Sequence, residues 1–264
     1  MAKKSLGQNF LLDPQLLARI ARAGGDFNGK HVIEVGPGPG GLTRALLDTG
    51  AVAVHAIERD DRCIEALQSL VTAANGRLIL HAEDALKIDY ETITPAPRAL
   101  LANLPYNIAT PLLVGWLEKI HLFDSLTLMF QREVADRLTA APRSKDYGRI
   151  SILAQWLCRV EKKFDIPPGA FLPPPKITSS VVHFVPRDNA HERHLFRYIE
   201  RVTGAAFGQR RKMLRQSLKQ LNVDTEKFMH DTGVSPTARA EEIDVAGFVR
   251  MAQALAGLSV EMKS

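Results

Sequence analysis

The tetrapeptide Asn103-Leu104-Pro105-Tyr106 presents hydrogen-bond acceptors and an aromatic face within one short stretch. The side-chain oxygen of Asn103 and the backbone carbonyl of Leu104 can both accept from an amine, and Pro105 would stiffen the turn that presents them. An amine on an aromatic ring, such as that of adenine, is a weak nucleophile because its lone pair is delocalised. Two acceptors would draw it toward tetrahedral geometry and aim the lone pair, so positioning would supply most of the catalysis.

Two aromatic residues could form the walls of a pocket for such a base. Tyr106 directly follows the acceptors, and stacking of an extruded base on an aromatic ring is worth ~1–3 kcal/mol. Phe171 lies in a proline-rich stretch, residues 170–175, whose prolines hold the backbone extended, and it could form the opposite wall. The plain alternatives are that Asn103 and Pro105 are ordinary turn residues and that Phe171 anchors a loop in the core.

A glycine-rich loop at residues 36–41 (GPGPGG) lies between a predicted strand and a predicted helix. Gly36, Gly38 and Gly41 satisfy the G-x-G-x-x-G pattern of dinucleotide-binding sites. Glu58 ends the second predicted strand, where an acid would bind ribose hydroxyls. A NAD-dependent enzyme is therefore one interpretation, and a Gly/Pro turn without a ligand is another.

Two details of the loop favour S-adenosylmethionine instead. A pyrophosphate needs backbone N–H donors, and Pro37 and Pro39 supply none. Glu34, just before the loop, would repel a pyrophosphate but suits the cationic amino-acid end of S-adenosylmethionine, whose sulfonium would drive methyl transfer. Asp84 follows the third predicted strand and could accept from the cofactor's adenine amine, although a lone Asp there is most often a helix cap.

An alternation of apolar strands and helices must position these residues. The patterns predict strands at residues 31–35, 52–57, 78–81, 99–102, 125–130, 164–166 and 180–185, and helices at residues 14–23, 42–47, 61–70, 110–117 and 133–138. This order predicts an α/β fold whose mostly parallel sheet is covered on both faces. Right-handed crossovers place the carboxyl ends of the parallel strands at one edge, where ligands bind.

The strand signals end at residue 186, and the helical runs beyond it are short and charged. We therefore predict two domains, residues 1–186 and a small all-α domain at residues 187–264. The net charge of +5 favours a polyanionic partner, and residues 201–223 contain several basic residues and no acid. Arg211, Arg215 and Lys219 recur every four residues, which predicts one basic face of a helix for RNA phosphates. A solvated helix face is the alternative.

Composition excludes several classes of protein. The chain is 45% hydrophobic and 24% charged, as globular proteins are. No apolar run approaches the ~18 residues of a membrane helix, and no secretory signal follows the N-terminal lysines, so we expect a cytoplasmic protein. Cys63 and Cys158 are the only cysteines and lack nearby ligand partners, so no metal is expected. No heptad repeat or long edge strand indicates a partner subunit, so we expect a monomer.

Together these motifs resemble the ribosomal RNA adenine N6-dimethyltransferase family. The matching segments span nearly the whole chain; they are Gly7-Gln8-Asn9-Phe10-Leu11, the glycine loop with its flanks (residues 34–43), Asn103-Leu104-Pro105-Tyr106-Asn107-Ile108, Gln131-Arg132-Glu133-Val134, Phe171-Leu172-Pro173-Pro174-Pro175-Lys176 and Phe207-Gly208-Gln209-Arg210-Arg211-Lys212. The resemblance implies a class I, Rossmann-like methyltransferase domain with a seven-stranded, mostly parallel sheet. It also implies a small helical C-terminal domain and S-adenosylmethionine as methyl donor.

The resemblance further assigns roles to individual residues. Those implied to contact the cofactor are Asn9, Leu11, Gly36, Glu58, Asp84 and Asn103. Those implied to act on the base are Asn103, Leu104, Pro105, Tyr106 and Phe171. The basic residues expected to bind RNA are Arg210, Arg211, Lys212, Arg215 and Lys219. Of the cofactor contacts, Asn9 and Leu11 follow from the resemblance alone.

The resemblance implies a substrate as well: 16S rRNA within the small ribosomal subunit or its precursor, dimethylated at the N6 amines of two adjacent adenosines near its 3′ end, with a role in subunit biogenesis. One alternative is a 23S rRNA adenine methyltransferase of the antibiotic-resistance type, which shares fold, cofactor and chemistry. The segment at residues 207–212 and the fuller C-terminal domain favour the small subunit. A second alternative is a non-catalytic RNA-binding assembly factor, which the intact glycine loop and acceptor turn disfavour.

Overall fold

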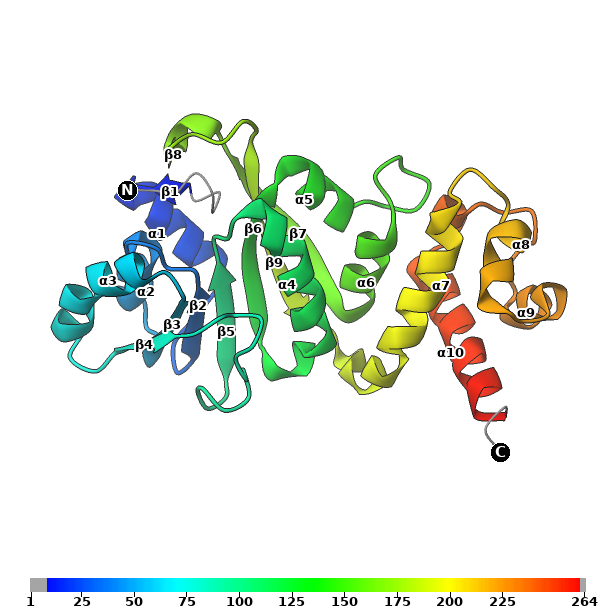
Figure 1. Cartoon of the computed structure of the whole chain (residues 1–264), viewed down its shortest axis with the longest axis horizontal. Coiled ribbons are helices and arrows are strands. Elements are labelled where there is room, and N and C mark those ends of the chain that lie inside the picture. Colours follow the sequence, from blue (N-terminus) through cyan, green and yellow to red (C-terminus); the bar gives the residue numbers. More distant parts are fainter. Residues whose placement is uncertain (1–8, 262–264) are drawn as a thin grey trace. The chain divides into compact units, whose positions relative to one another are not determined.

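The computed structural model describes residues 9–261, apart from the side chains of residues 106–107, 189–191 and 259–261. Its centre is a seven-stranded sheet in the order β4-β3-β2-β5-β6-β9-β7 (Figure 1). The strands are β2 (His31–Val35), β3 (Ala53–Glu58), β4 (Leu78–Ala82), β5 (Arg98–Ala102), β6 (Ser125–Gln131), β7 (Cys158–Ile166) and β9 (Ser179–Pro186). Neighbours from β4 to β6 are parallel, and β9 is antiparallel to β6. The predicted α/β fold is confirmed.

Helices connect these strands, and an aspartate caps two of them. They are α1 (Pro14–Ala23), α2 (Gly41–Leu47), α3 (Asp61–Ala73), α4 (Tyr106–Glu118) and α5 (Arg132–Leu138). Asp13 and Asp60 accept hydrogen bonds from the backbone N–H groups two residues later, which satisfies donors in the first turns of α1 and α3.

The start of α4 corrects the prediction. We expected the helix to open at Thr110-Pro111, but it begins at Tyr106, with Pro105 as its N-cap and Pro111 inside the helix. The earlier start places the acceptor turn directly against the first turn of the helix. Proline signals a helix start only statistically, because the fold can accept one missing N–H early in a helix.

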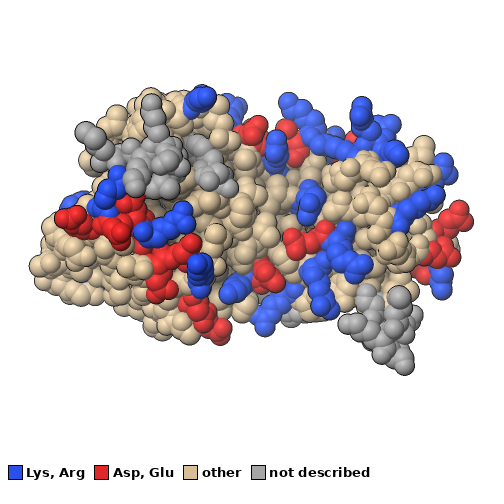
Figure 2. All heavy atoms as spheres, viewed as in Figure 1, with Lys and Arg blue, Asp and Glu red and all other residues tan. Residues whose placement is uncertain are grey.

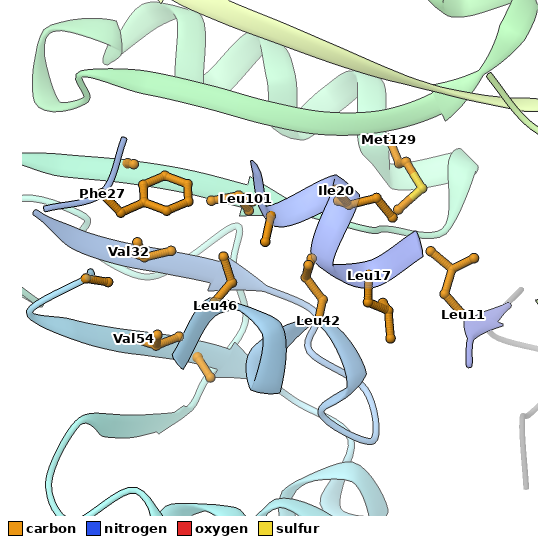
Figure 3. Packing of buried hydrophobic residues seen from close by; sticks show 14 of the residues in the cluster. Leu11, Leu17, Ile20, Phe27, Val32, Leu42, Leu46, Val54, Leu101 and Met129 are labelled. Carbon is orange, nitrogen blue, oxygen red and sulfur yellow. The ribbon is translucent and has the colours of Figure 1, made fainter. Parts of the chain in front are cut away.

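The core of the sheet lies beneath α1 and α2. Leu17 of α1, Leu42 and Leu46 of α2, and Val32 and Val54 of the sheet belong to one buried cluster (Figure 3). All five are at most 7% exposed. Side chains alternate between the faces of a strand, and the intervening residues are buried too, which accounts for the continuous apolar runs in these strands.

A separate two-stranded ribbon lies outside this sheet. Strand β1 (Phe10–Leu11) pairs antiparallel with β8 (Phe171–Leu172), so Phe10 is opposite Leu172 and Leu11 is opposite Phe171. The sequence predicts only an extended backbone around Phe171 and a plain polar turn before Phe10. The ribbon joins the N-terminal segment to the proline-rich stretch.

The chain forms two compact units: residues 1–135 with 161–186, and residues 136–160 with 187–264. The second unit contains α6 (Arg149–Leu157), α7 (Phe196–Gly208), α8 (Leu214–Ser217), α9 (Thr225–Thr232) and α10 (Val245–Glu261), with short 3-10 turns between them. The chain crosses from the first unit to the second at residue 187, where we predicted the domain boundary. Residues 136–160, however, group with the C-terminal unit. Domains at 1–186 and 187–264 stay a prediction.

The second unit has its own aromatic core. Phe207 lies 6.3 Å from Tyr147 and 5.8 Å from Phe248, measured between ring centroids. Tyr147 is fully buried and comes from the hydrophilic segment between α5 and α6, so this segment is anchored by one aromatic side chain. None of the helices among the described residues has the length and apolarity needed to cross a membrane.

Candidate active site

A cavity of about 610 Å³ opens at the carboxyl edge of β2, β3, β4 and β5. It is lined by nearly every residue that the sequence predicts for the cofactor and the base: Asn9, Leu11, Gly36, Glu58, Asp84, Asn103, Leu104, Pro105 and Phe171. The backbone of Tyr106 begins α4, and its side chain is outside the described residues. These segments are distant in sequence, and parallel strands bring them to one edge.

The glycine loop uses its own N–H groups. Gly36 donates to the carbonyl of Ile57 at 2.9 Å, and Gly40 donates to the carbonyl of Pro37 at 3.1 Å. Gly38 donates to Oε2 of Glu58 at 3.2 Å. Since the loop prolines supply no donor, the donors that a pyrophosphate would need at these positions are already used. The loop therefore does not fit a dinucleotide.

The loop also approaches the acceptor turn closely. Gly36 has a φ of +71°, which favours glycine, and a Cβ there would lie 3.0 Å from Cδ2 of Leu104. Leu104 is only 6% exposed. The Leu104 side chain therefore packs on the loop that follows β2, next to the carbonyl that is one predicted acceptor.

Glu58 is a buried carboxylate with most of its acceptor capacity used. Oε1 accepts from the backbone N–H groups of Arg59 and Asp60, both at 2.9 Å, and Oε2 accepts from Gly38. A carboxylate offers about four acceptor positions, so Oε2 retains room for one further donor. A ribose hydroxyl is a donor of the right kind, and the side chain lines the cavity.

Asp84 caps a turn and also lines the cavity, where its contact with the cofactor stays a prediction. Its Oδ1 accepts from the N–H of Leu86 at 3.0 Å, as in a cap or turn, and its Oδ2 pairs with Arg59 at 3.3 Å. The Arg59 side chain is 58% exposed, so this ion pair contributes little to stability. The carboxylate lines the cavity and keeps lone pairs for an adenine amine.

Glu34 provides the clearest test of fit for S-adenosylmethionine. It is 1% exposed on the cavity wall, and its Oε2 has no hydrogen-bond partner among the residues that the structure describes. Burial raises the pKa of this carboxyl to about 7; Thr43 beside it lowers the pKa in part, and nearby Glu58 raises it. A buried acceptor without a partner fits a cationic ligand and disfavours an anionic one.

Phe10 lines the same cavity and was missed by sequence reasoning as a site residue. Its ring lies against the glycine loop, because a Cβ added to Gly38 would meet Cε1 of Phe10 at 2.8 Å. Phe171, opposite the first strand of the ribbon, is 4% exposed. A lone Phe beside a polar turn carries no local signal for such a contact.

The five basic residues predicted to bind RNA lie in the second unit, but not on one helix face. Helix α7 ends at Gly208, Arg211 lies in a turn, and Arg215 and Lys219 lie in successive short helical turns. The predicted helix is wrong because a long-range contact interrupts it. Met213 has extended backbone and forms an antiparallel bridge with Arg239, which belongs to a distant segment of the chain.

One of these residues is paired with an acid. Arg210 forms a 3.2 Å ion pair with Glu241 and donates to the carbonyl of Ser144 at 3.4 Å. The absence of acids from residues 201–223 therefore does not make every cation available, because Glu241 comes from a distant segment. Exposed side chains are retained by Arg211, Lys212, Arg215 and Lys219.

The fold and the cavity define a class of protein. A Rossmann-like sheet with a glycine loop after β2, an acid at the end of β3, and acceptors after β5 is the arrangement of a class I methyltransferase. When bound, S-adenosylmethionine supplies an electrophilic methyl group on its sulfonium. Asn103 and the Leu104 carbonyl can hold an amine, and Glu34, Glu58 and Asp84 can hold the donor.

Comparison with known proteins identifies the family. The chain belongs to the ribosomal RNA adenine dimethylase family, whose model matches residues 1–257. It is 58% identical to the ribosomal RNA small subunit methyltransferase A of Azorhizobium caulinodans, over 96% of this chain and 88% of that protein. It is also 58% identical to the protein of the same name from Xanthobacter autotrophicus, over 97% of this chain and 90% of that one.

Solved structures agree with this assignment. The chain is similar to a dimethyladenosine transferase from Plasmodium falciparum, with a TM-score of 0.78 and 25% identity over 92% of this chain and 95% of that one. It is also similar to the 23S rRNA methyltransferase ErmE, with a TM-score of 0.69 and 25% identity over 94% and 100% of the two chains. The predicted fold, enzyme class and cofactor are confirmed, and a NAD-dependent enzyme is excluded.

Proposed function

We propose that this enzyme transfers methyl groups from S-adenosylmethionine to the N6 amines of two adjacent adenosines near the 3′ end of 16S rRNA, in the small ribosomal subunit or its precursor, as a step of subunit biogenesis. Relatives at 53–58% identity are named small subunit methyltransferases. The observation that carries the chemistry is the meeting of the glycine loop and the acceptor turn, at Gly36 and Leu104, on one cavity.

The geometry supports catalysis by positioning. In the first transfer the Asn103 side-chain oxygen and the Leu104 carbonyl accept from the two N–H bonds of the target amine and aim its lone pair at the methyl group. The methylated nitrogen then releases one proton to water, and a single N–H remains for these acceptors in the second transfer. Phe171 forms one wall for the base, and Tyr106 would stack on its other face. Neither acceptor is a strong base, so they hold the amine and do not deprotonate it before transfer. Asn9, Leu11 and the strand-end carboxylates hold the donor.

The second unit supplies a surface for phosphates. Three segments converge there, because Arg143 donates its N–H to the carbonyl of Glu241 at 2.7 Å, Arg210 reaches Ser144, and Met213 pairs with Arg239. The exposed cations on these segments are Arg143, Lys145, Arg211, Lys212, Arg215 and Arg239. Lysine and arginine side chains gather over this unit in Figure 2. Phosphate contacts would position the RNA without reading its sequence.

Modification mapping tests the proposal. The purified protein is incubated with labelled S-adenosylmethionine and either small or large ribosomal subunits from a strain lacking these methyl groups, and the rRNA is analysed by mass spectrometry. We expect N6,N6-dimethyladenosine at two adjacent positions of 16S rRNA, and formation slowed by about 10²–10³-fold with Asn103→Ala. Methylation of 23S rRNA alone would replace our substrate with the antibiotic-resistance type, which the likeness to ErmE makes the specific alternative.

We propose that the enzyme works as a monomer in the cytoplasm, where ribosomal subunits are assembled. Light scattering of the purified protein checks this: a mass near 29.1 kDa is expected. A concentration-independent dimer would contradict it.

A further inference from the structure

The N-terminal segment lies directly on the glycine loop. A Cβ at Gly38 would be 2.8 Å from Cε1 of Phe10 and 3.2 Å from Cδ1, so the ring packs on the loop backbone. One residue on, the carbonyl of Leu11 would lie 3.3 Å from a Cβ at Gly41. Two successive residues of β1 therefore touch two positions of the loop, Gly38 and Gly41, that both line the cavity.

The same segment is paired with the wall of the base pocket. Leu11 is opposite Phe171 in the ribbon, and both are buried, at 5% and 4% exposed. The ribbon has two residues in each strand and does not join the seven-stranded sheet. Two-stranded ladders are marginally stable on their own, so the order of this ribbon depends on the surfaces against which it packs.

We propose that the β1–β8 ribbon couples cofactor binding to capture of the target adenosine, and that Phe10 is the positioning residue that seats the ribbon on the glycine loop. The inference rests on the proposed function of the cavity. A cofactor that contacts the loop and the Asn9–Leu11 segment restricts β1, and the pairing restricts Phe171 with it. The base then meets a wall that is already ordered.

Thermodynamic linkage makes the coupling reciprocal. If S-adenosylhomocysteine tightens the binding of RNA by some factor, RNA tightens the binding of S-adenosylhomocysteine by the same factor. Phe10 acts through the ribbon and the loop, so its loss should lower this factor. A residue that only stabilised the fold would lower stability and leave the factor unchanged.

The experiment measures the affinity of unmethylated small ribosomal subunits for the full-length protein by filter binding, with and without saturating S-adenosylhomocysteine. We expect about fivefold or more tighter binding with the ligand in the unmodified protein. In Phe10→Ala the factor should fall to near one, while binding of subunits without S-adenosylhomocysteine stays within about twofold. Phe10→Leu, which keeps apolar contact with the loop, should give an intermediate factor and also covers the case in which Phe10→Ala does not fold.

Leu12→Ala is the matched control, because Leu12 adjoins β1, is 59% exposed and is of similar apolar character. Its factor should equal that of the unmodified protein. A full factor in Phe10→Ala or, if that variant is unfolded, in Phe10→Leu would overturn the role of Phe10, and a factor of one in the unmodified protein would overturn the coupling. A protein that does not bind S-adenosylhomocysteine in calorimetry would instead refute the proposed function, so the two failures are distinguishable.

Discussion

The backbone N–H of Gly38 donates a 3.2 Å hydrogen bond to Oε2 of Glu58, 20 residues later in the chain. The bond ties the loop after β2 to the end of β3, and both line the cavity. Gly38 has a φ of +56° and packs against the Phe10 ring. One carboxylate thus holds the shape of the loop and leaves a single acceptor position toward the ligand.

Glu58→Gln should weaken both the loop and the cofactor site. The amide keeps one oxygen but places an NH2 group where backbone donors point, so at least one buried donor loses its acceptor at a cost of about 1–3 kcal/mol. We expect cofactor affinity to fall by about 5- to 150-fold in calorimetry, converted from the same energies. Glu65→Gln, the same change on an exposed helix position, is the control. Unchanged affinity in Glu58→Gln would show that Glu58 does not face the cofactor.

Cofactor affinity should depend on pH through Glu34. Its pKa is raised to about 7, chiefly by burial, and only the ionised form attracts the cationic end of the cofactor. Affinity should therefore rise as pH increases from 5.5 to 7, by up to about tenfold for each unit below the pKa. Glu34→Gln should bind more weakly and show a flat profile. Calorimetry across this range measures both; a flat profile in the unmodified protein contradicts the role of Glu34.

The same residue should cost stability in the cofactor-free protein. Because the pKa of folded Glu34 is raised from 4.5 to about 7, the folded state holds a proton that the unfolded state releases, and stability is lost as pH rises from 4.5 through 7. A shift of this size corresponds to about 3 kcal/mol. Glu34→Gln should raise the unfolding temperature at pH 8 relative to the unmodified protein, with little difference at pH 4.5. Thermal unfolding at the two pH values checks the sign.

Asn103→Ala should separate turnover from binding. The change removes one of two acceptors that orient the target amine, and the loss of one preorganised hydrogen bond of this kind typically costs about 10²–10³-fold in turnover. We propose that the second unit supplies most of the RNA affinity, so this affinity should stay within about twofold. Single-turnover methylation and filter binding measure the two quantities. Near-normal turnover would refute the acceptor role.

Arg211→Ala and Arg210→Ala form a matched pair for the RNA surface. Arg211 is exposed, whereas Arg210 is held by Glu241 and Ser144. If Arg211 contacts a phosphate, its loss should lower the salt slope of RNA binding by about 0.7–0.9. Arg210→Ala should leave the slope nearly unchanged. The salt slope of each variant is obtained from RNA affinities measured between low and moderate salt. Equal changes of slope in the two variants would show that Arg211 and Arg210 do not differ in phosphate contact.

The strands, the glycine loop and the acceptor turn could be read from the sequence because each has a local signal. Apolar strands bounded by glycine, a capping Asp13 and an Asn-Leu-Pro turn at residues 103–105 are set by neighbours in the chain. The order of these elements then places Gly36, Glu58 and Asn103 at one sheet edge, since parallel strands with right-handed crossovers allow few other arrangements. Local signals therefore predicted most residues that line the cavity, whereas Asn9 and Leu11 followed from the family resemblance alone and Phe10 was missed.

Contacts between residues far apart in sequence were decided by the tertiary structure alone. The pairing of Leu11 with Phe171, the bridge between Met213 and Arg239, and the ion pair of Arg210 leave no pattern in either local segment. These contacts depend on which surfaces come together when the chain packs. The bridge at Met213 is not visible in the local sequence, so the sequence predicted a basic helix where the chain turns. The sequence by itself determined what chemistry the cavity can do, and tertiary packing decided how its parts are held and which charges remain available.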